Sequence, residues 1–570
     1  MWKKRDDSKT LEDIIRRNTG QSIDSVLHPR HDSQITNLEQ AAALIREATR
    51  RKTPITIVGD YDADGITGSA ILCLTLKALG TNADVRLPKR FTEGYGISMT
   101  MLDGITEGLL ITVDNGITAV EEIAAAKAKG LQVVVLDHHI AREDGLLPEA
   151  DVLVNPHVLP NGEFSDYCGA GLAHKLACLL LEDESLLERL CALAAIGTVA
   201  DVVPLKDDNR SIVQNGLRAI NQGNCPQGLN ELLNQINLFD VDEGDISFTI
   251  APILNAAGRM HDDGAIRSFM LLTESGSASK LAEELIRINE ERKAAQQNGL
   301  QAAQDMIDEN CLYGDRALLV YSNGRETTKI PEGIAGILAG RLSERYQVPA
   351  FVLTSSGTKG ILKGSGRSYG NIDIKALLDS AASLLEAYGG HPKAAGLSVR
   401  EENVEPLRSF LNERLAELPE TAGDMDTLFY DLEVEAAQLP SLIEQLAAFA
   451  PFGEGNERPV ILVRNQQLYP RQRRFFTYMG RDDQHIKLYC GNKLAAVGFD
   501  LAEKYTEQGE PISLDLIGTI FTNKYMDPMG RRLKETQLRI DDLRKPTVVA
   551  FSSPLTASVQ ARLEALGGVV

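Results

Sequence analysis

The chain has 570 residues, of which 43% are hydrophobic and 24% are charged. This composition is ordinary for a soluble globular protein and excludes a collagen-like, coiled-coil or intrinsically disordered chain. At about 150 residues per domain, the length predicts roughly four domains. The sequence has no apolar run of about eighteen residues and no apolar core near its start, so we expect neither a membrane-spanning helix nor a secretory signal.

Charge and cysteine content bear on partners and compartment. The chain carries 59 basic and 80 acidic residues, a net charge of −21. An evenly acidic surface repels nucleic acid, so DNA binding would require basic residues concentrated in one place. The seven cysteines are odd in number and form no CxxC pair. This disfavours a zinc ribbon or a disulfide framework and predicts a reducing, cytoplasmic location.

The first part of the chain alternates predicted helices with short apolar strands. An amphipathic helix is predicted at residues 37–52 and a long helical stretch at residues 171–197. Between them, strands and helices alternate over residues 53–60, 66–80, 108–116, 117–130, 131–139 and 151–156. The alternation predicts βαβ units and a parallel sheet covered on both faces. Such sheets bind ligands beyond the carboxyl ends of their strands.

The rest of the chain predicts three further elements. Residues 277–310 lack proline and predict one long helix that connects two domains. A second α/β region follows, with strands at 316–322 and 349–355, a glycine-rich loop at 357–368 and helices at 333–346 and 374–388. From about residue 425, five short strands separated by turn residues predict a barrel of OB type.

Acids and histidines follow three of the predicted strands. They are Asp60, Asp62 and Asp64, then Asp114, then Asp137, His138 and His139, and the segment 197–205 adds Asp201. We expect all of them along one rim of the sheet. Crowded carboxylates raise one another's pKa, and divalent cations remove this conflict. Oxygen-rich sites with one imidazole suit Mn²⁺ or Mg²⁺ better than zinc, and two ions about 3.5–4 Å apart can promote phosphoryl displacement.

These motifs carry a family resemblance. The sequences DYDADG, VDNG, DHH and GTVADVVPL resemble the signature motifs of the DHH phosphoesterase superfamily. Downstream, GSGRS and GGHPKAAG resemble the associated DHHA1 domain. Together with LNAAGR, the long connector and the OB-like region, they resemble the RecJ single-strand-specific 5′→3′ DNA exonucleases over roughly residues 40–545. One departure is the stretch from Lys329 to Gly333, which lacks the family's usual tryptophan-histidine pair.

The resemblance implies a domain order. The expected fold is α/β: a parallel-sheet DHH domain joined by a long helix to a smaller α/β DHHA1 domain, followed by an all-β OB-like barrel. The expected boundaries are an N-terminal segment at 1–36, a DHH catalytic domain at 37–275, a connector helix at 276–310, a DHHA1 domain at 311–424, an OB-fold domain at 425–545 and a C-terminal segment at 546–570.

The resemblance also implies residue roles at the metal rim. The metal ligands would be Asp62, Asp64, Asp114, His138 and Asp201, holding two Mn²⁺ or Mg²⁺ ions. Asp60 would be a further ligand or an acid that orients the site. His139 would face the scissile phosphate as electrophile or proton donor. Asn115 would either hold the bridging carboxylate or cap the next helix.

Substrate contacts are implied in two places. The residues expected to grip a terminal phosphate are Arg90, Arg259, Arg367, Ser368 and His391. In the barrel, the residues expected to follow the DNA backbone are Arg471, Arg473, Arg474 and Lys487, which are interleaved with aromatic residues. These local basic clusters would answer the objection raised by the net charge.

The function implied is a metal-dependent 5′→3′ exonuclease that degrades single-stranded DNA to nucleoside 5′-monophosphates in recombination and repair. A helicase and a single-strand-binding protein are expected partners, and no membrane is involved. One alternative is a short-oligonucleotide or cyclic-dinucleotide phosphodiesterase, which needs no barrel or long connector. Another is a non-catalytic DHH-fold scaffold of a replication complex, against which the complete set of motif acids and histidines argues.

Overall fold

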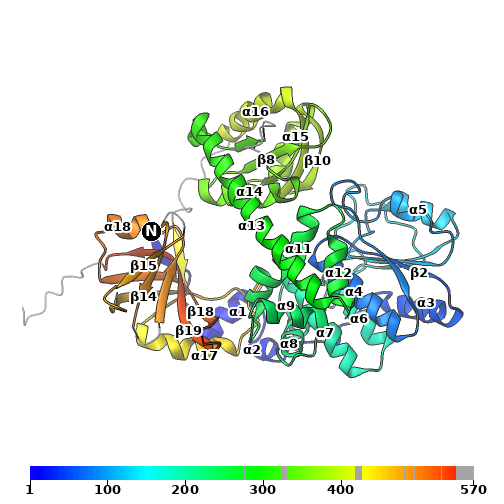
Figure 1. Ribbon diagram of the computed structural model, residues 1–570, viewed down its shortest axis with the longest axis horizontal. Coiled ribbons are helices and arrows are strands. Elements are labelled where there is room, and N and C mark those ends of the chain that lie inside the picture. The colour runs from blue at the N-terminus through cyan, green and yellow to red at the C-terminus, as the bar shows by residue number, and fades with distance from the viewer. Residues whose placement is uncertain are drawn as a thin grey trace, which may run out of the picture. The chain divides into compact units, whose positions relative to one another are not determined.

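The computed structural model describes residues 1–274, 276–322, 330–417, 427–480, 483–491, 494–527 and 529–546 (Figure 1). The chain divides into two compact units. One comprises Met1–Ile14, Asp426–Ala448 and Arg458–Val570, and the other comprises Ile15–Met425 and Phe449–Glu457. The C-terminal segment expected at 546–570 lies outside the described residues except for Pro546, and Lys329 also lies outside them. Among the described helices, none is both long and apolar enough to cross a membrane.

The larger unit contains the expected parallel sheet. Its strands are β2 (Ile55–Val58), β3 (Ala83–Arg86), β4 (Leu109–Val113), β5 (Gln132–Leu136) and β6 (Val152–Val154), in the order β3-β2-β4-β5-β6 with every neighbour parallel. Ile57 and Ile111 point into one apolar core, and Val58 and Leu110 point into another. Because both faces are buried, the strands read as continuous apolar runs.

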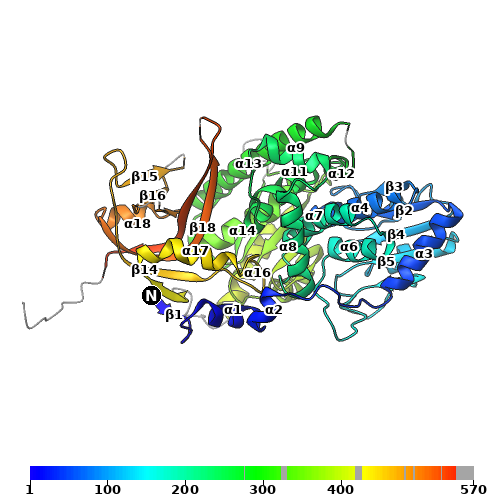
Figure 2. The same cartoon turned by 90° about the horizontal axis from the view of Figure 1, so that it is seen from below.

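Helices make up most of the chain from Leu11 to Thr273 outside these strands. They are α1 (Leu11–Thr19), α2 (Ile23–Leu27), α3 (Leu38–Arg51), α4 (Ala63–Ala78), α5 (Val120–Ala128), α6 (Gly169–Leu180), α7 (Glu184–Ala200), α8 (Asp207–Asn221), α9 (Gln227–Gln235), α10 (Glu243–Asp245), α11 (Ala251–Met260) and α12 (Ala265–Thr273). Helices α7 and α8 pack side by side (Figure 2). The single stretch expected at 171–197 is two helices, because Asp183 caps a new helix by accepting the Leu186 N–H.

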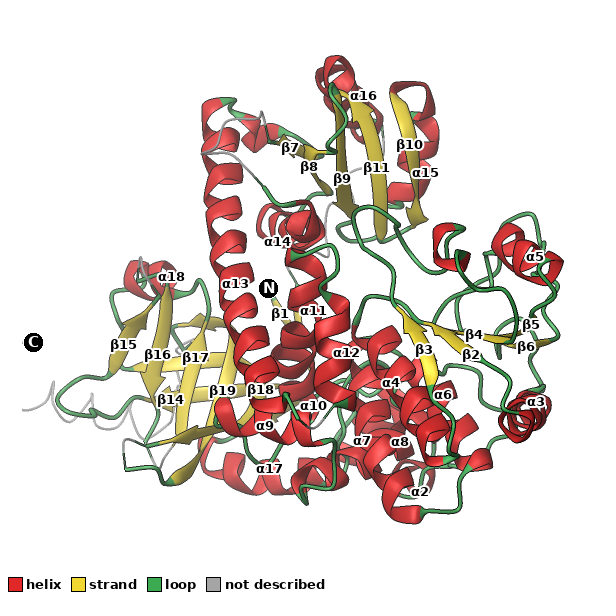
Figure 3. Ribbon diagram, turned by 45° about the vertical axis from the view of Figure 1, so that its right-hand side comes forward, coloured by secondary structure: helices red, strands yellow, loops and turns green. Residues whose placement is uncertain are grey.

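The long helix expected after residue 276 is confirmed as α13 (Ala278–Glu309). Its first half buries Leu281, Leu285 and Ile288 in the core of the first α/β region. Its second half buries Ala303 and Ile307 in the core of the second α/β region. One helix therefore joins the two regions of the larger unit (Figure 3).

The second α/β region is built on a mixed sheet. Its strands are β7 (Leu318–Tyr321), β8 (Ala350–Ser355), β9 (Ile361–Arg367), β10 (Leu385–His391) and β11 (Ala394–Arg400), in the order β10-β11-β9-β8-β7. Helix α14 (Ala335–Tyr346) packs on one face, and α15 (Ile374–Ser380) and α16 (Val404–Ala416) pack on the other.

Two secondary-structure predictions in this region are wrong. The expected glycine-rich loop is largely strand β9, and the expected helix at 374–388 ends at Ser380 before strand β10 begins at Leu385. The glycines of β9 serve close packing. A Cβ at Gly364 would lie 2.0 Å from the Val352 carbonyl oxygen, and one at Gly366 would lie 2.5 Å from the Phe351 ring.

The smaller unit holds a seven-stranded sheet, here called the OB sheet. Its strands are β13 (Leu432–Val434), β14 (Val460–Gln467), β15 (Phe476–Met479), β16 (His485–Tyr489), β17 (Leu494–Gly498), β18 (Ser513–Met526) and β19 (Arg532–Arg544). The five expected strands are present, and β13 and β15 add to them. Strand β1 (Trp2–Lys4) pairs with β12 (Leu428–Tyr430). The sequence did not predict this pair, because three residues are too few to show the alternation of a strand. Helices α17 (Leu439–Ala447) and α18 (Ala502–Glu507) complete the unit.

Candidate metal centre

The site begins at the end of strand β2, where the chain turns into helix α4. Asp62 caps this helix, and its Oδ1 accepts the N–H groups of Asp64 at 3.1 Å and Gly65 at 3.2 Å. Asp60 is buried directly beneath the turn. A Cβ at Gly65 would lie 2.6 Å from the Asp60 nitrogen, so glycine allows this close approach.

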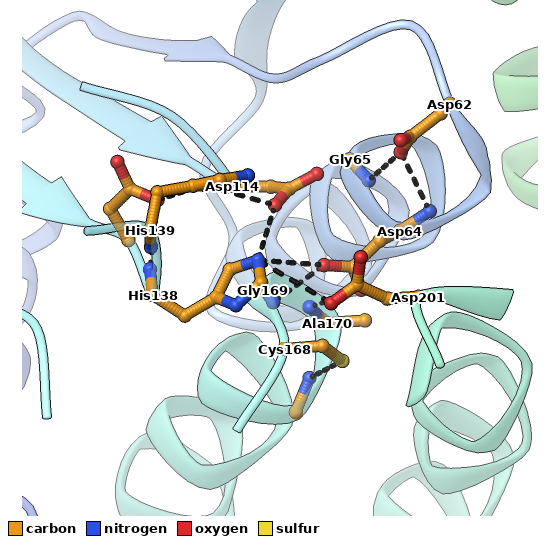
Figure 4. Close-up of polar contacts among 12 residues, drawn as sticks. Asp62, Asp64, Gly65, Asp114, His138, His139, Cys168, Gly169, Ala170 and Asp201 are labelled. Carbon is orange, nitrogen blue, oxygen red and sulfur yellow. Dashed lines mark hydrogen bonds and ion pairs between the residues drawn. The ribbon is translucent and has the colours of Figure 1, made fainter. Parts of the chain in front are cut away.

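Asp64 is oriented by the start of helix α6. Its Oδ2 accepts the Gly169 N–H at 2.6 Å, and its Oδ1 accepts the Ala170 N–H at 2.9 Å. A Cβ at Gly169 would lie 2.5 Å from Asp114 Cβ, and one at Gly197 would lie 2.6 Å from Asp64 Oδ1. These glycines let helices α4, α6 and α7 and the end of β4 converge on one point (Figure 4).

His138 stands at the centre of the acids. Its Nε2 lies 3.1 Å from Asp114 Oδ1, 3.6 Å from Asp201 Oδ2 and 3.9 Å from Asp64 Oδ2 (Figure 4). Asp114 follows strand β4 in the left-handed region, with φ of 62°. Asp201, which the segment 197–205 was expected to add to the rim, is the C-cap residue of helix α7. The rim is therefore made by strand ends and a helix end together.

Three sets of side chains have ligand atoms close enough to share a cation. They are Asp60, Asp62 and Asp114; Asp114, His138 and His139; and Asp64, His138 and Asp201. Asp114 and His138 each belong to two sets. Asp60 Oδ2 is buried without a hydrogen-bond partner. An unsatisfied carboxylate oxygen among oxygen and imidazole donors fits Mn²⁺ or Mg²⁺.

The acids also carry the electrostatic signature of a cation site. Burial, followed by the charges of neighbouring acids, raises the pKa of Asp60, Asp62 and Asp114. The same causes raise the pKa of Asp201 to about 8. Without a cation, these carboxylates therefore bind protons near neutral pH or repel one another.

His139 is held by a different acid. Its Nδ1 lies 2.8 Å from Asp137 Oδ1, and the buried Asp137 carboxylate also accepts the Ile117 N–H. Burial opposes the charged imidazole, but the hydrogen bond and charge of Asp137 outweigh it and raise the pKa of His139 to about 9. The Tyr95 hydroxyl lies 3.0 Å from His139 Nε2 and donates to the Asp114 carbonyl at 3.0 Å.

Asp137 was expected on the rim, as the first letter of the DHH motif, but without a role of its own, and Tyr95 was not expected at the site. Tyr95 lies in the loop between β3 and β4, where nothing in the sequence indicates which strand end it approaches.

Asn115 does neither of the two things expected of it. Its side-chain nitrogen donates to the carbonyls of Val58 and Val113, and its oxygen accepts the Ile97 N–H. It makes no contact with a carboxylate, and helix α5 begins later, at Val120. The amide instead ties the ends of β2 and β4 to the following loop.

The expected phosphate-binding arginines meet in a cavity of about 510 Å³. Arg90, Arg259 and Arg367 line it, and Tyr61, which stands between Asp60 and Asp62, lines it as well. The cavity therefore opens beside the acids. Arg90 also lies over the Tyr61 ring, with its guanidinium carbon 4.5 Å from the ring centroid.

Ser368 and His391 are not among the residues that line this cavity, and their expected phosphate contacts stay a prediction. The Ser368 hydroxyl donates to the Ile372 carbonyl, and His391 is exposed at the end of β10. Ser365, two residues earlier on the same strand, lines the cavity and accepts from Arg367 Nη1 at 2.8 Å. Because side chains alternate along a strand, Ser365 and Arg367 lie on the same face of β9. The sequence predicted a loop here, and a loop gives no basis for assigning residues to a face.

The cavity arginines lack internal counter-ions. Within the described residues, none of Arg90, Arg259 and Arg367 forms an ion pair with a carboxylate. Burial, followed by the charge of Arg90, lowers the pKa of Arg259 to about 10 and also lowers that of Arg367. An anionic ligand would relieve this repulsion.

The basic residues of the OB sheet divide into two kinds. Arg471 and Lys487 face Glu535, at 3.5 Å and 3.0 Å. Arg473 and Arg474 are exposed and form no ion pair with the described residues. The structure thus leaves two of the four expected DNA contacts free.

Comparison with known proteins places the chain in a family. Three family models match: DHH family, N-terminal domain, at residues 54–198; DHHA1 domain at 319–417; and RecJ OB domain at 430–542. The single-stranded-DNA-specific exonuclease RecJ of Haemophilus influenzae is 31% identical over 504 residues, which cover 84% of this chain and 85% of that protein. The chain belongs to the RecJ family.

Further members extend the likeness. RecJ of Bacillus subtilis is 33% identical over 89% of this chain, which spans 63% of that protein's length. A crystal structure of RecJ from Thermus thermophilus in complex with Mn²⁺ matches 96% of this chain and 79% of that chain, with a TM-score of 0.74 and 27% identity. The RecJ resemblance and the expected fold class are confirmed.

The crowded acids predict that losing one charge stabilises the metal-free protein. Raised carboxyl pKa values mean that folding binds protons, so stability falls as pH rises from the ordinary value of about 4 to the Asp201 value of about 8. In EDTA, Asp114→Asn should melt at a higher temperature than the wild type near pH 8, and the difference should shrink toward about pH 5. Asparagine also tolerates the left-handed backbone.

Asp103→Asn, which removes an exposed carboxylate outside the cluster, is the matched control. An Asp114→Asn midpoint equal to or below that of the wild type at both pH values would contradict the electrostatic account.

Proposed function

We propose that this RecJ-family protein is a metal-dependent exonuclease that degrades single-stranded DNA from its 5′ end, releases nucleoside 5′-monophosphates and acts in recombination and repair. The observation that carries this proposal is the cavity of unpaired arginines opening beside a cluster of acids and histidines. The match to a RecJ OB domain supports it over a short-oligonucleotide or cyclic-dinucleotide phosphodiesterase and over a non-catalytic scaffold.

In this proposal, the acids hold two Mn²⁺ or Mg²⁺ ions. The ligands would be Asp62, Asp64, Asp114, His138 and Asp201, with Asp114 shared between the ions and Asp60 as a further ligand. Such a pair of ions activates water and stabilises the charge of a phosphoryl displacement. Asp64 arrives already oriented by two backbone N–H groups, so it needs little rearrangement to bind.

His139 would act on the phosphate itself. Asp137 keeps its imidazole charged at neutral pH, and Tyr95 limits its rotation. A charged imidazole can donate a hydrogen bond to a phosphate oxygen or a proton to the leaving oxygen. Asn115 would position the rim without touching the substrate.

The arginine cavity would hold the 5′-terminal phosphate. Three guanidiniums without internal counter-ions suit a terminal phosphate, which carries more negative charge than an internal diester. Ser365 would supply a hydroxyl group inside this cavity. Because the cavity adjoins the acids at Tyr61, a phosphate held there would place a nearby phosphodiester at the metal rim.

Partners and location complete the proposal. Single-stranded DNA is the substrate, and the names of the curated relatives support this substrate class. A helicase that exposes single strands and a single-strand-binding protein would supply that substrate. Seven free cysteines suit a reducing cytoplasm.

The direct test uses purified full-length protein, Mn²⁺ and single-stranded DNA labelled separately at each end. The 5′ label should be released first, as a mononucleotide. Asp114→Asn should remain folded and lose this activity, whereas Asp103→Asn should retain it. Release from the 3′ end, or equal attack on blunt duplex, would refute the proposal.

The phosphate cavity predicts a preference for a 5′-phosphorylated strand. Losing one charged hydrogen bond costs about 1.5–3 kcal/mol, or roughly ten- to a hundredfold in affinity. Arg367→Ala should therefore weaken binding of the phosphorylated strand by about that factor and leave binding of the 5′-hydroxyl strand nearly unchanged. Arg345→Ala, which removes an exposed arginine outside the cavity, is the control. Equal losses on both strands would exclude the terminal-phosphate role.

The OB sheet predicts a difference between its arginines. Each phosphate contact on single-stranded DNA contributes about 0.7 to the slope of log affinity against log salt concentration. Replacing both Arg473 and Arg474 with alanine should therefore reduce the slope by up to about 1.4. Arg471→Ala should change it little, because Arg471 already faces Glu535. An unchanged slope in the double variant would show that this edge does not bind DNA.

A further inference from the structure

A short segment of the OB region packs into the unit that carries the metal centre. This segment, Phe449–Glu457, is here called the strap. It lies within the sequence matched by the RecJ OB domain, directly after α17 and before β14. Both of those elements belong to the smaller unit, whereas the strap belongs to the larger one. A segment of the sequence that matches the RecJ OB domain therefore forms part of the unit that carries the metal centre.

Arg210 anchors the strap in the larger unit. Its side chain, on helix α8, is fully buried. The guanidinium donates to the carbonyls of Phe449 at 2.9 Å, Ala450 at 2.8 Å and Pro451 at 3.0 Å, and also to that of Val26 at 2.7 Å. Without the strap, most of these buried donors would lose their acceptors, which is costly for a charged group. The strap is therefore an integral part of this unit.

The turn between α7 and α8 needs external support. It follows Asp201; Val202 within it has φ of 59°, and Asp207, the first residue of α8, has φ of 42°. A β-branched residue is strained in this left-handed region and persists there only when its surroundings fix it. The Val202 side chain is 64% exposed, so its own packing does not supply that constraint.

The strap supplies contacts to the same turn. The Leu205 N–H donates to the Glu454 carbonyl at 2.8 Å. A Cβ at Gly453 would lie 2.8 Å from Leu205 Cδ1, and one at Gly455 would lie 2.9 Å from Lys206 Cε. The two strap glycines thus lie flat against the turn, and a side chain at either one would press on it.

We propose that the strap is a positioning element of the metal centre. It holds the turn after Asp201 in its strained form and so keeps the Asp201 carboxylate 3.6 Å from His138 Nε2. The inference rests on the proposed role of Asp201 as a metal ligand. It gives residues within the RecJ OB match a role in assembling the metal centre of the larger unit, to which the strap belongs.

The test measures Mn²⁺ affinity directly, from the electron paramagnetic resonance signal of free Mn²⁺ over full-length protein. Gly453→Val should push Leu205 and the turn away. Groups that orient metal ligands typically contribute about ten- to a hundredfold to metal affinity, so the Mn²⁺ dissociation constant should rise by roughly that factor. Gly314→Val, at a glycine with open space around its Cα, is the matched control and should bind as the wild type does.

Nuclease activity gives a second readout. Activity of Gly453→Val should be low at limiting Mn²⁺ and recover at saturating Mn²⁺, which a purely structural defect would not do. Arg210→Met, which removes the anchor and keeps the apolar stem, should show the same weakened Mn²⁺ binding. Wild-type Mn²⁺ affinity in both variants would overturn the inference. If the wild type binds Mn²⁺ but cuts no DNA, the proposed function fails while the strap is still judged by binding.

Discussion

Crowding of like charge is the constraint on which this structure depends. Asp60, Asp64 and Asp114 are almost wholly buried; Asp64, Asp114 and Asp201 surround the His138 imidazole, and Asp60 and Asp62 cluster with Asp114. Carboxylates at this density raise one another's pKa and disfavour the folded chain unless a cation compensates them. The neighbouring backbone follows from that requirement. Glycines let three helices and a strand end converge, and the N–H groups at the start of α6 donate to the Asp64 carboxylate.

The arginine cavity beside the acids is crowded with positive charge in the same way. The charge of Arg90 disfavours the charged forms of Arg259 and Arg367, and within the described residues none of the three arginines forms an ion pair with a carboxylate. Tyr61 lines the arginine cavity and stands between Asp60 and Asp62 in the sequence, so it lies between the arginines and the acids. A nucleic-acid terminus with bound metal ions would compensate both charges at once, because its phosphates meet the arginines and the ions meet the acids. Binding of such a ligand would therefore reduce the repulsion among the acids and among the arginines together.

Much of this was predictable from local sequence, because strand ends in a parallel sheet share one rim. Asp62, Asp64, Asp114 and His138 follow from that rule. Asp201 was found through its motif, but its helix end was not foreseen. Ser365 was missed because a glycine-rich strand reads as a loop, so its face could not be assigned. Tyr95, the strap and strand β1 were beyond prediction, since their partners lie far away in the sequence and no periodicity marks them.

The central proposal is that the acids around Asp114 would hold two metal ions in one site, and magnetic coupling tests it most directly. Mn²⁺ ions about 3.5–4 Å apart and bridged by a carboxylate interact, and the resulting electron paramagnetic resonance spectrum differs from that of isolated ions. The account predicts a coupled spectrum at two Mn²⁺ per chain in the wild-type protein and an uncoupled spectrum in Asp114→Asn. A single uncoupled Mn²⁺ at saturation of the wild-type protein would contradict it.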